Sequence, residues 1–123
     1  MKKINVAIIG VGSFTKALVE GVSFYIKNED ETRGLINPLV GDYKVSDINF
    51  VAAFDVDERK VGKKLHEAIS QGANVTKDIT SPVEFEAKVY RGPTADGVVE
   101  QMKGSFVKES SESSVDIAKV LKE

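Results

Sequence analysis

Residues 4–21 read "INVAIIGVGSFTKALVEG", and this stretch decides the fold. Residues 4–9 are almost all apolar without alternation, which predicts a strand covered on both faces, as in a parallel sheet. The run breaks at a Gly-Val-Gly turn, Gly10 to Gly12. From Ser13 to Lys27 apolar residues recur at spacings of three and four, which predicts a helix packed through one face. The residues predicted to face inward are Phe14, Ala17, Leu18, Gly21, Val22 and Tyr25.

A second buried strand is predicted at residues 48–56, "INFVAAFDV", after a polar connection over residues 28–47. Asp57 is placed to cap a helix that continues to about Gln71, and Gly72 is placed to end it. The inward residues predicted for this helix are Val61, Leu65, Ala68 and Ile69.

The third strand has two candidates. One is the short stretch 74–79, "NVTKDI", and the other is the segment 83–89, where apolar and charged residues alternate. Alternation of this kind is typical of a half-exposed strand. Two further helices are predicted, one over residues 98–106 and one over residues 114–123 with Ile117, Ala118 and Leu121 on its apolar face.

This order of strands and helices predicts an α/β fold with right-handed crossovers and a mostly parallel sheet. We expect one domain over residues 1–123, a Rossmann-like doubly wound fold that is incomplete. It would contain the first half of the dinucleotide fold with flanking elements, and the chain stops where such a fold would place another strand.

Composition excludes several classes of protein. The net charge is −2 with mixed signs, which argues against a nucleic-acid or anionic membrane surface. There is no cysteine, so disulfides, thiolate metal sites and cysteine nucleophiles are excluded. No apolar run reaches membrane-spanning length. We therefore expect a cytoplasmic protein without nucleic-acid or membrane partners.

The glycines fit the roles of a dinucleotide-binding turn. Gly10 would make the tight turn and Gly12 would let the backbone approach a pyrophosphate. The pyrophosphate would lie on free N–H groups at the helix start, around Ser13 and Phe14, where the helix dipole favours anions. The third position of the motif is Thr15, which is larger than the usual glycine or alanine. A Gly-x-Gly turn that binds nothing remains the alternative.

Asp55, at the end of the second strand, strengthens the nucleotide interpretation. A carboxylate there accepts the ribose hydroxyls of NAD and repels the 2′-phosphate of NADP. Asp55 lies 40 residues beyond Thr15, and the connection 28–47 accounts for 20 of them, which restores the usual spacing of about 20. The alternatives are a solvated strand end or a local cap. Arg59 and Lys60 fit better as exposed residues of the next helix than as ligands of a 2′-phosphate.

Other candidates for chemistry are poor. His66 is the single histidine and is expected on the surface of a helix. The acidic groups Asp55/Asp57 and 29–31 lack further ligands for a metal and are expected to be solvated or to cap helices. No lysine stands in an apolar context that would depress its pKa for acid–base work.

Several longer stretches resemble one family. They are "VAIIGVG" (6–12), "ALVEGVSFY" (17–25), "GDYKVSDINFVAAFDVDERKVGKKLHEAI" (41–69), "VYRGPTADG" (89–97) and "DIAKVLKE" (116–123). In this order they resemble the amino-terminal region of the archaeal and bacterial inositol-3-phosphate synthases. "SDINFVAAFDVDERKVGK" and "YRGPTADG" are far more specific than the glycine motif.

The resemblance implies an NAD-dependent isomerase of inositol phosphate and phospholipid biosynthesis. Such enzymes convert glucose 6-phosphate to inositol 3-phosphate by oxidation, aldol cyclisation and reduction, with NAD recycled in each turnover. The family places an alanine where Thr15 stands, and small or amide residues directly after Gly12. Family members continue into a catalytic domain whose positions are absent here, so no catalytic residue carries over and this chain alone is expected to be inactive.

Three interpretations stay open. The chain is the NAD-binding part of such a synthase, or a stand-alone nucleotide-binding or regulatory module, or a degenerate scaffold that acts by self-association. An unpaired sheet edge invites pairing, so a homo-oligomer is expected in each case.

Overall fold

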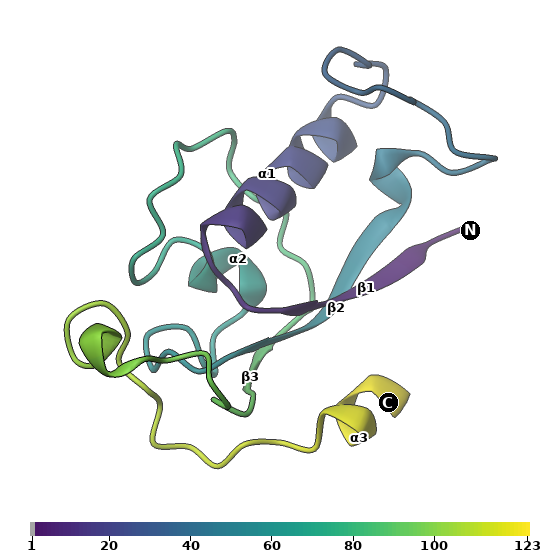
Figure 1. Cartoon of the computed structure of the whole chain (residues 1–123). Coiled ribbons are helices and arrows are strands. Elements are labelled where there is room, and N and C mark those ends of the chain that lie inside the picture. Colours follow the sequence, from purple (N-terminus) through teal and green to yellow (C-terminus); the bar gives the residue numbers. More distant parts are fainter. Residues whose placement is uncertain (1) are drawn as a thin grey trace.

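The computed structural model describes residues 2–123. Its centre is a three-stranded parallel sheet in the order β1-β2-β3, formed by β1 (Ile4–Ile9), β2 (Ile48–Asp55) and β3 (Val89–Arg91) (Figure 1). Ile4 pairs with Ile48 at the start of β1, and the register shifts by one residue of β2 between Val6 and Ala7. This is the strand order of the first half of a dinucleotide fold, so the predicted fold class, a partial Rossmann-like α/β fold, is confirmed.

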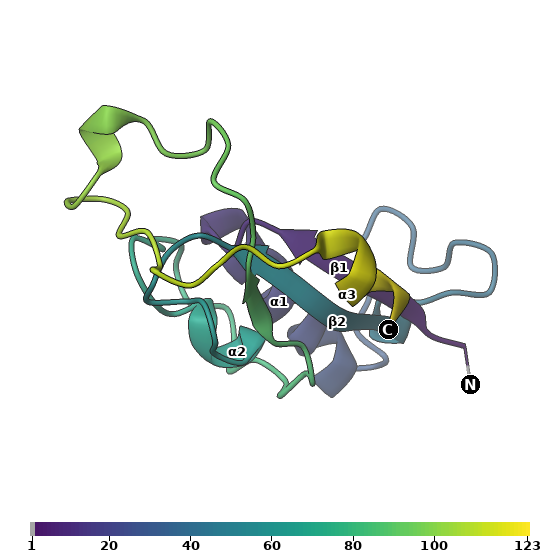
Figure 2. The same ribbon diagram turned by 90° about the horizontal axis from the view of Figure 1, so that it is seen from below.

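Three α-helices accompany the sheet: α1 (Ser13–Lys27), α2 (Leu65–Ala68) and α3 (Ile117–Lys122). Figures 1 and 2 show α1 and α3 on opposite sides of the sheet. Short 3-10 helices occur at Val45–Asp47 and Glu100–Met102. No helix within residues 2–123 is long and apolar enough to cross a membrane.

The core lies between the sheet, α1 and α2. Phe50 of β2 and Phe85 meet edge to face, with ring centroids 4.9 Å apart. Of the four inward residues predicted for the helix after β2, Leu65, Ala68 and Ile69 are fully buried and Val61 is partly buried. Burial at 85–89 follows the predicted alternation, because Phe85, Ala87 and Val89 are buried and the residues between them are exposed. The strand predicted over 83–89 is nevertheless misplaced, since β3 begins only at Val89.

The predicted inward face of α1 is wrong. Phe14 is 94% exposed and Leu18 is 48% exposed, and of the predicted face only Val22 is fully buried. The residues that α1 does bury are two valines and four polar residues: Val19 and Val22, and Thr15, Lys16, Glu20 and Ser23. Lys16, Glu20 and Ser23 are buried because the segment 74–83 passes over this side of α1 and supplies their polar partners, which a count of apolar residues does not register.

The helix predicted over 57–71 is shorter, because residues 62–65 pair with the chain leading into β3. The N–H of Gly62 donates to the Val89 carbonyl and that of Leu65 donates to the Ala87 carbonyl. Gly62 has a φ of +87°, which interrupts a helix. Gly72, with a φ of +69°, ends the turn after α2 as predicted.

Three other predictions need correction. Residues 74–79 form no strand, because their polar groups bond to α1 instead of to the sheet. The predicted helix 98–106 is a single 3-10 turn. In α3, Ala118 and Leu121 are exposed, and Ile117 and Val120 are the partly buried residues.

Candidate functional site

The glycine turn lies at the carboxyl end of β1, beside the carboxyl end of β2. Gly10 has a φ of +92°, a conformation that favours glycine, and its N–H donates to the Phe54 carbonyl at 2.8 Å. Thr15 is buried, and its hydroxyl donates to the Gly10 carbonyl at 2.6 Å. The β-branched Thr15 is therefore accommodated beneath the turn, where it closes the loop.

Gly12 differs from Gly10, because its φ of −97° is open to any residue. A Cβ placed on Gly12 would meet nothing within 4 Å, so packing within the chain does not require glycine here. The first helical hydrogen bond runs from the Lys16 N–H to the Gly12 carbonyl, and no side chain caps α1. The N–H groups of residues 13–15 have no partner within the helix and form a site of positive potential.

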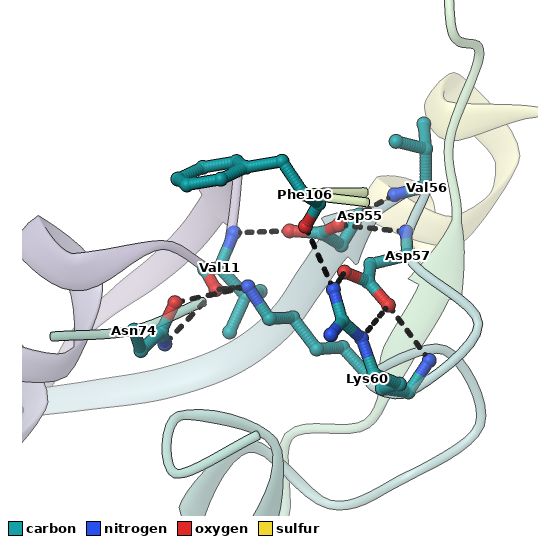
Figure 3. Close-up of polar contacts among 8 residues, drawn as sticks. Val11, Asp55, Val56, Asp57, Lys60, Asn74 and Phe106 are labelled. Atoms are coloured by element: carbon teal, nitrogen blue, oxygen red, sulfur yellow. Dashed lines mark hydrogen bonds and ion pairs between the residues drawn. The ribbon is translucent and has the colours of Figure 1, made fainter. Parts of the chain in front are cut away.

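Asp55 joins the end of β2 to the glycine turn. One carboxylate oxygen accepts the Val11 N–H at 2.6 Å, and the other accepts the N–H groups of Val56 at 2.7 Å and Asp57 at 2.9 Å (Figure 3). Each carboxylate oxygen can accept more than one hydrogen bond, so acceptor capacity remains. The Asp55 carboxylate is therefore not a freely solvated strand end: it caps the local backbone at Val56 and Asp57 and also fixes the turn after β1.

The two cations after β2 are both engaged. Arg59 binds both carboxylate oxygens of Asp57, at 2.9 and 2.6 Å, and donates to the Phe106 carbonyl. Burial of the Asp57 carboxyl acts to raise its pKa, but the hydrogen bonds and charge of Arg59 outweigh burial and hold the pKa below its usual range. Of the two roles predicted for Asp57, a solvated acid is wrong, because the residue is buried, whereas its carboxylate does accept the Arg59 N–H at 2.9 Å, as a local cap does.

Lys60 also departs from its prediction, because it is 6% exposed and not a surface residue. Its ammonium donates to the Val11 carbonyl at 2.7 Å and to Asn74 Oδ1 at 3.0 Å. The turn that replaces the first part of the predicted helix directs Lys60 under the glycine loop. No feature of the sequence around Lys60 distinguishes it from its solvated neighbours.

The segment after Gly72 forms the third side of the site. The Val75 N–H donates to the Ser13 hydroxyl at 3.1 Å, and the Thr76 hydroxyl donates to the Ser13 carbonyl at 3.3 Å. Further along, the buried ammonium of Lys16 binds Asp78 at 2.6 Å and Glu20 at 3.2 Å. Asp78 foremost, with Glu20, raises the pKa of Lys16 above 10.5, even though burial acts to lower it. Lys16 was missed, although Lys and Glu four residues apart on a helix are a recognisable pair.

These elements surround a pocket of about 700 Å³ at the carboxyl ends of the strands. Four of the six predicted site residues line it: Gly10, Gly12, Ser13 and Asp55. Phe14 points to solvent and Thr15 lies below the turn, so their side chains do not contribute. The lining also includes Lys60, Asn74 and residues of the loop after β3, among them Pro93 and Thr94, which were not predicted as site residues.

Among residues 2–123, no cluster of three or more His, Asp or Glu side chains could hold a metal ion. The side chain of His66 is only 20% exposed, so the prediction of a surface histidine needs correction. Its Nδ1 has no hydrogen-bond partner in the described part of the chain. His66 does not line the pocket.

Comparison with known proteins gives a consistent assignment. The chain is 44% identical, over 98% of its length, to inositol-3-phosphate synthase from Mycolicibacterium smegmatis, of which it covers 34%. In solved structures it is similar to the protein Ari2 (TM-score 0.69, 30% identity, covering 77% of this chain and 31% of Ari2). It is also similar to a myo-inositol-1-phosphate synthase-related protein from Thermotoga maritima (TM-score 0.51, 32% identity, 73% and 22% covered). No protein-family model matches the chain. The chain thus spans about a third of the length of the curated relative.

Proposed function

We propose, on the premise that the chain is a homologue of the inositol-3-phosphate synthases, that it forms the NAD-binding part of such an enzyme. The observation that carries this proposal is the convergence of three features in one pocket. The glycine turn, the amino terminus of α1 and the Asp55 carboxylate all meet at the carboxyl ends of β1 and β2. Ligands of open parallel sheets bind at this edge.

The pyrophosphate of NAD would lie over Gly12 and the first turn of α1. The N–H groups of the first turn, which have no partner within the helix, would point toward a bound anion, and the helix dipole favours negative charge. The empty space around the Gly12 Cα supports this placement, because glycine at a position with ordinary backbone angles and no close neighbour leaves room for a ligand.

The ribose of the adenosine would bind Asp55. Its carboxylate is already oriented by three backbone N–H groups, so no ordering is needed when the two ribose hydroxyls arrive. Arg59 and Lys60 are held by other partners and are not free to bind a 2′-phosphate. This arrangement favours NAD over NADP.

The proposed reaction of the complete enzyme is conversion of glucose 6-phosphate to inositol 3-phosphate by internal oxidation, aldol cyclisation and reduction. When bound, NAD would accept a hydride from the sugar and return it to the cyclised product in the same turnover. The residues of this chain would bind and orient the adenosine and pyrophosphate. Because the chain spans about a third of the M. smegmatis relative, nucleotide binding and not synthase activity is the direct test of the proposal.

Calorimetric titration of the whole chain with NAD, and separately with NADP, tests the proposal. We expect NAD to bind at least about tenfold more tightly than NADP, because the Asp55 carboxylate repels a 2′-phosphate and the Lys60 ammonium that lines the pocket is held by Val11 and Asn74. Equal affinities would contradict the assignment of Asp55 to the ribose, and no binding of either nucleotide would contradict the proposed function.

Self-association is a second candidate, favoured by the free edge of β1. In the sheet order β1-β2-β3, β1 has a neighbour on one side within residues 2–123. Exposed apolar side chains lie along it, including Ile4 at 38% and Ile9 at 78% exposure. An edge of this kind can pair with a second copy of the chain.

Light scattering after size exclusion tests this candidate. We expect a mass that rises with concentration toward twice 13.4 kDa, and a shift to the monomer in the Ile4→Lys variant, because a charge on an edge strand opposes pairing. Leu39→Lys, at an exposed apolar residue outside the sheet, is the matched control and should leave the mass unchanged. A monomer at every concentration would exclude pairing through β1.

A further inference from the structure

Lys60 reaches the glycine turn from below and contacts its backbone. The ammonium lies 2.7 Å from the Val11 carbonyl oxygen and 3.0 Å from Asn74 Oδ1 (Figure 3). Asn74 is itself held by the Ile69 carbonyl, which accepts its Nδ2 at 2.7 Å, so the Lys60–Asn74 pair is anchored to the end of the α2 turn. A buried ammonium is costly unless it has such partners.

The direction of the Val11 carbonyl fixes the direction of the next N–H. In a trans peptide unit the C=O and the N–H point in opposite directions, and no peptide bond in residues 2–123 is cis. The unit that carries the Val11 carbonyl also carries the Gly12 N–H. Since the carbonyl points to Lys60, the Gly12 N–H points away from Lys60.

The peptide unit on the other side of Val11 is fixed by a charge of opposite sign. The Val11 N–H donates to the Asp55 carboxylate at 2.6 Å, while the Val11 carbonyl accepts from Lys60. Within residues 2–123 the Gly12 N–H makes no backbone hydrogen bond, and no side chain caps the helix that follows. The Gly12 N–H is therefore an available donor at the start of α1, beside those of residues 13–15, and the Lys60 contact orients it.

We propose that Lys60 is a positioning residue, which holds the Val11 carbonyl so that the Gly12 N–H is presented to the diphosphate of the bound nucleotide. The inference rests on the proposed function, since it concerns the same nucleotide. Lys60 does not touch the ligand. Its charge also polarises the Val11–Gly12 peptide, which strengthens the N–H as a donor to an anion.

The test compares a ligand that carries a diphosphate with one that does not. ADP and adenosine are titrated into the ¹⁵N-labelled whole chain and into Lys60→Met, which keeps the length and apolar stem of the side chain. We expect the variant to bind ADP about tenfold more weakly, because the Gly12 N–H is no longer held toward the diphosphate, and to bind adenosine within about twofold of the wild type. The amide signal of Gly12 should shift in the free variant, and Lys60→Arg should recover part of the ADP affinity.

Two further variants make the test specific. Lys63→Met removes an exposed lysine of the same turn and should change neither affinity. Asn74→Ala removes the second partner of Lys60 together with the longer contact of 3.4 Å from Asn74 Nδ2 to the Val11 carbonyl, and it should weaken ADP binding, but not adenosine binding, by a smaller factor. It tests the same arrangement if Lys60→Met does not fold.

The outcomes separate this inference from the proposed function. If the wild type binds ADP and Lys60→Met binds it equally well, the positioning role is refuted and the nucleotide site stands. Equal loss of ADP and adenosine with an unmoved Gly12 amide would also refute it, because that is the result of a general structural role. If the wild type binds neither ligand, the proposed function fails and this inference fails with it.

Discussion

Replacing Asp55 with alanine is expected to weaken NAD binding by about a hundredfold or more. The carboxylate would make two charge-assisted hydrogen bonds to the ribose, each contributing on the order of 1.5–3 kcal/mol. The same substitution leaves the N–H groups of Val11, Val56 and Asp57 without their acceptor, so we also expect the free energy of unfolding to fall by about 2 kcal/mol. Calorimetric titration and denaturant unfolding measure the two effects separately.

Asp55→Asn is the control that separates charge from shape. It keeps one acceptor oxygen and the size of the side chain, but it removes the charge that repels a 2′-phosphate. We expect the preference for NAD over NADP to shrink by about tenfold, with less loss of stability than in Asp55→Ala. An unchanged preference would show that a group other than Asp55 selects the nucleotide.

Replacing Lys16 with methionine is expected to give the largest loss of stability, about 2–4 kcal/mol. Lys16 is 3% exposed and is the ion-pair partner of Glu20, whose side chain is 4% exposed. Removing the cation leaves a buried carboxylate without a counter-charge, and that costs more than the pair itself contributes. Chemical denaturation monitored by circular dichroism measures the change.

Two variants show whether the uncompensated charge is the cause. Lys16→Met combined with Glu20→Leu removes both charges and should recover most of the lost stability. Asp78→Asn removes only the exposed partner of Lys16 and should have a small effect, because that carboxylate is largely in water. A double variant as unstable as Lys16→Met alone would contradict this account.

The same ion pair predicts how stability changes at high pH. The pKa of Lys16 in the folded chain lies above its ordinary value of 10.5, through its hydrogen bond to Asp78 and the pairing with Glu20. Because the pKa of Lys16 is higher in the folded chain than in the unfolded chain, the ion pair contributes its full stabilisation at every pH below the unfolded-state pKa, and therefore at neutral pH. It should be lost as pH rises above 10.5 through the folded-state pKa, and Lys16→Met should lack this loss.

Local sequence determined the elements whose pattern depends on nearby residues. The apolar runs predict the strands β1 and β2, but the predicted burial of both faces is wrong for β1, where only Ile8 is buried. The glycines between β1 and α1 predict the turn, because a φ of +92° at Gly10 favours a residue without a Cβ. Gly10, Gly12, Ser13 and Asp55 were predicted as site residues and do line one pocket. The strand ends and the glycine turn bring them together, since the carboxyl ends of parallel strands share one edge of a sheet.

Tertiary structure decided what depends on partners distant in sequence. The buried side of α1 carries Lys16 and Glu20 because Asp78 and the segment around it lie against that helix. Lys60 is buried because residues 62–65 pair with the chain before β3, which replaces the predicted helix with a turn directed toward Val11. A lysine has the same local signal whether water or a carbonyl 49 residues away solvates its ammonium, so the positions of Lys16 and Lys60 could not be predicted from periodicity.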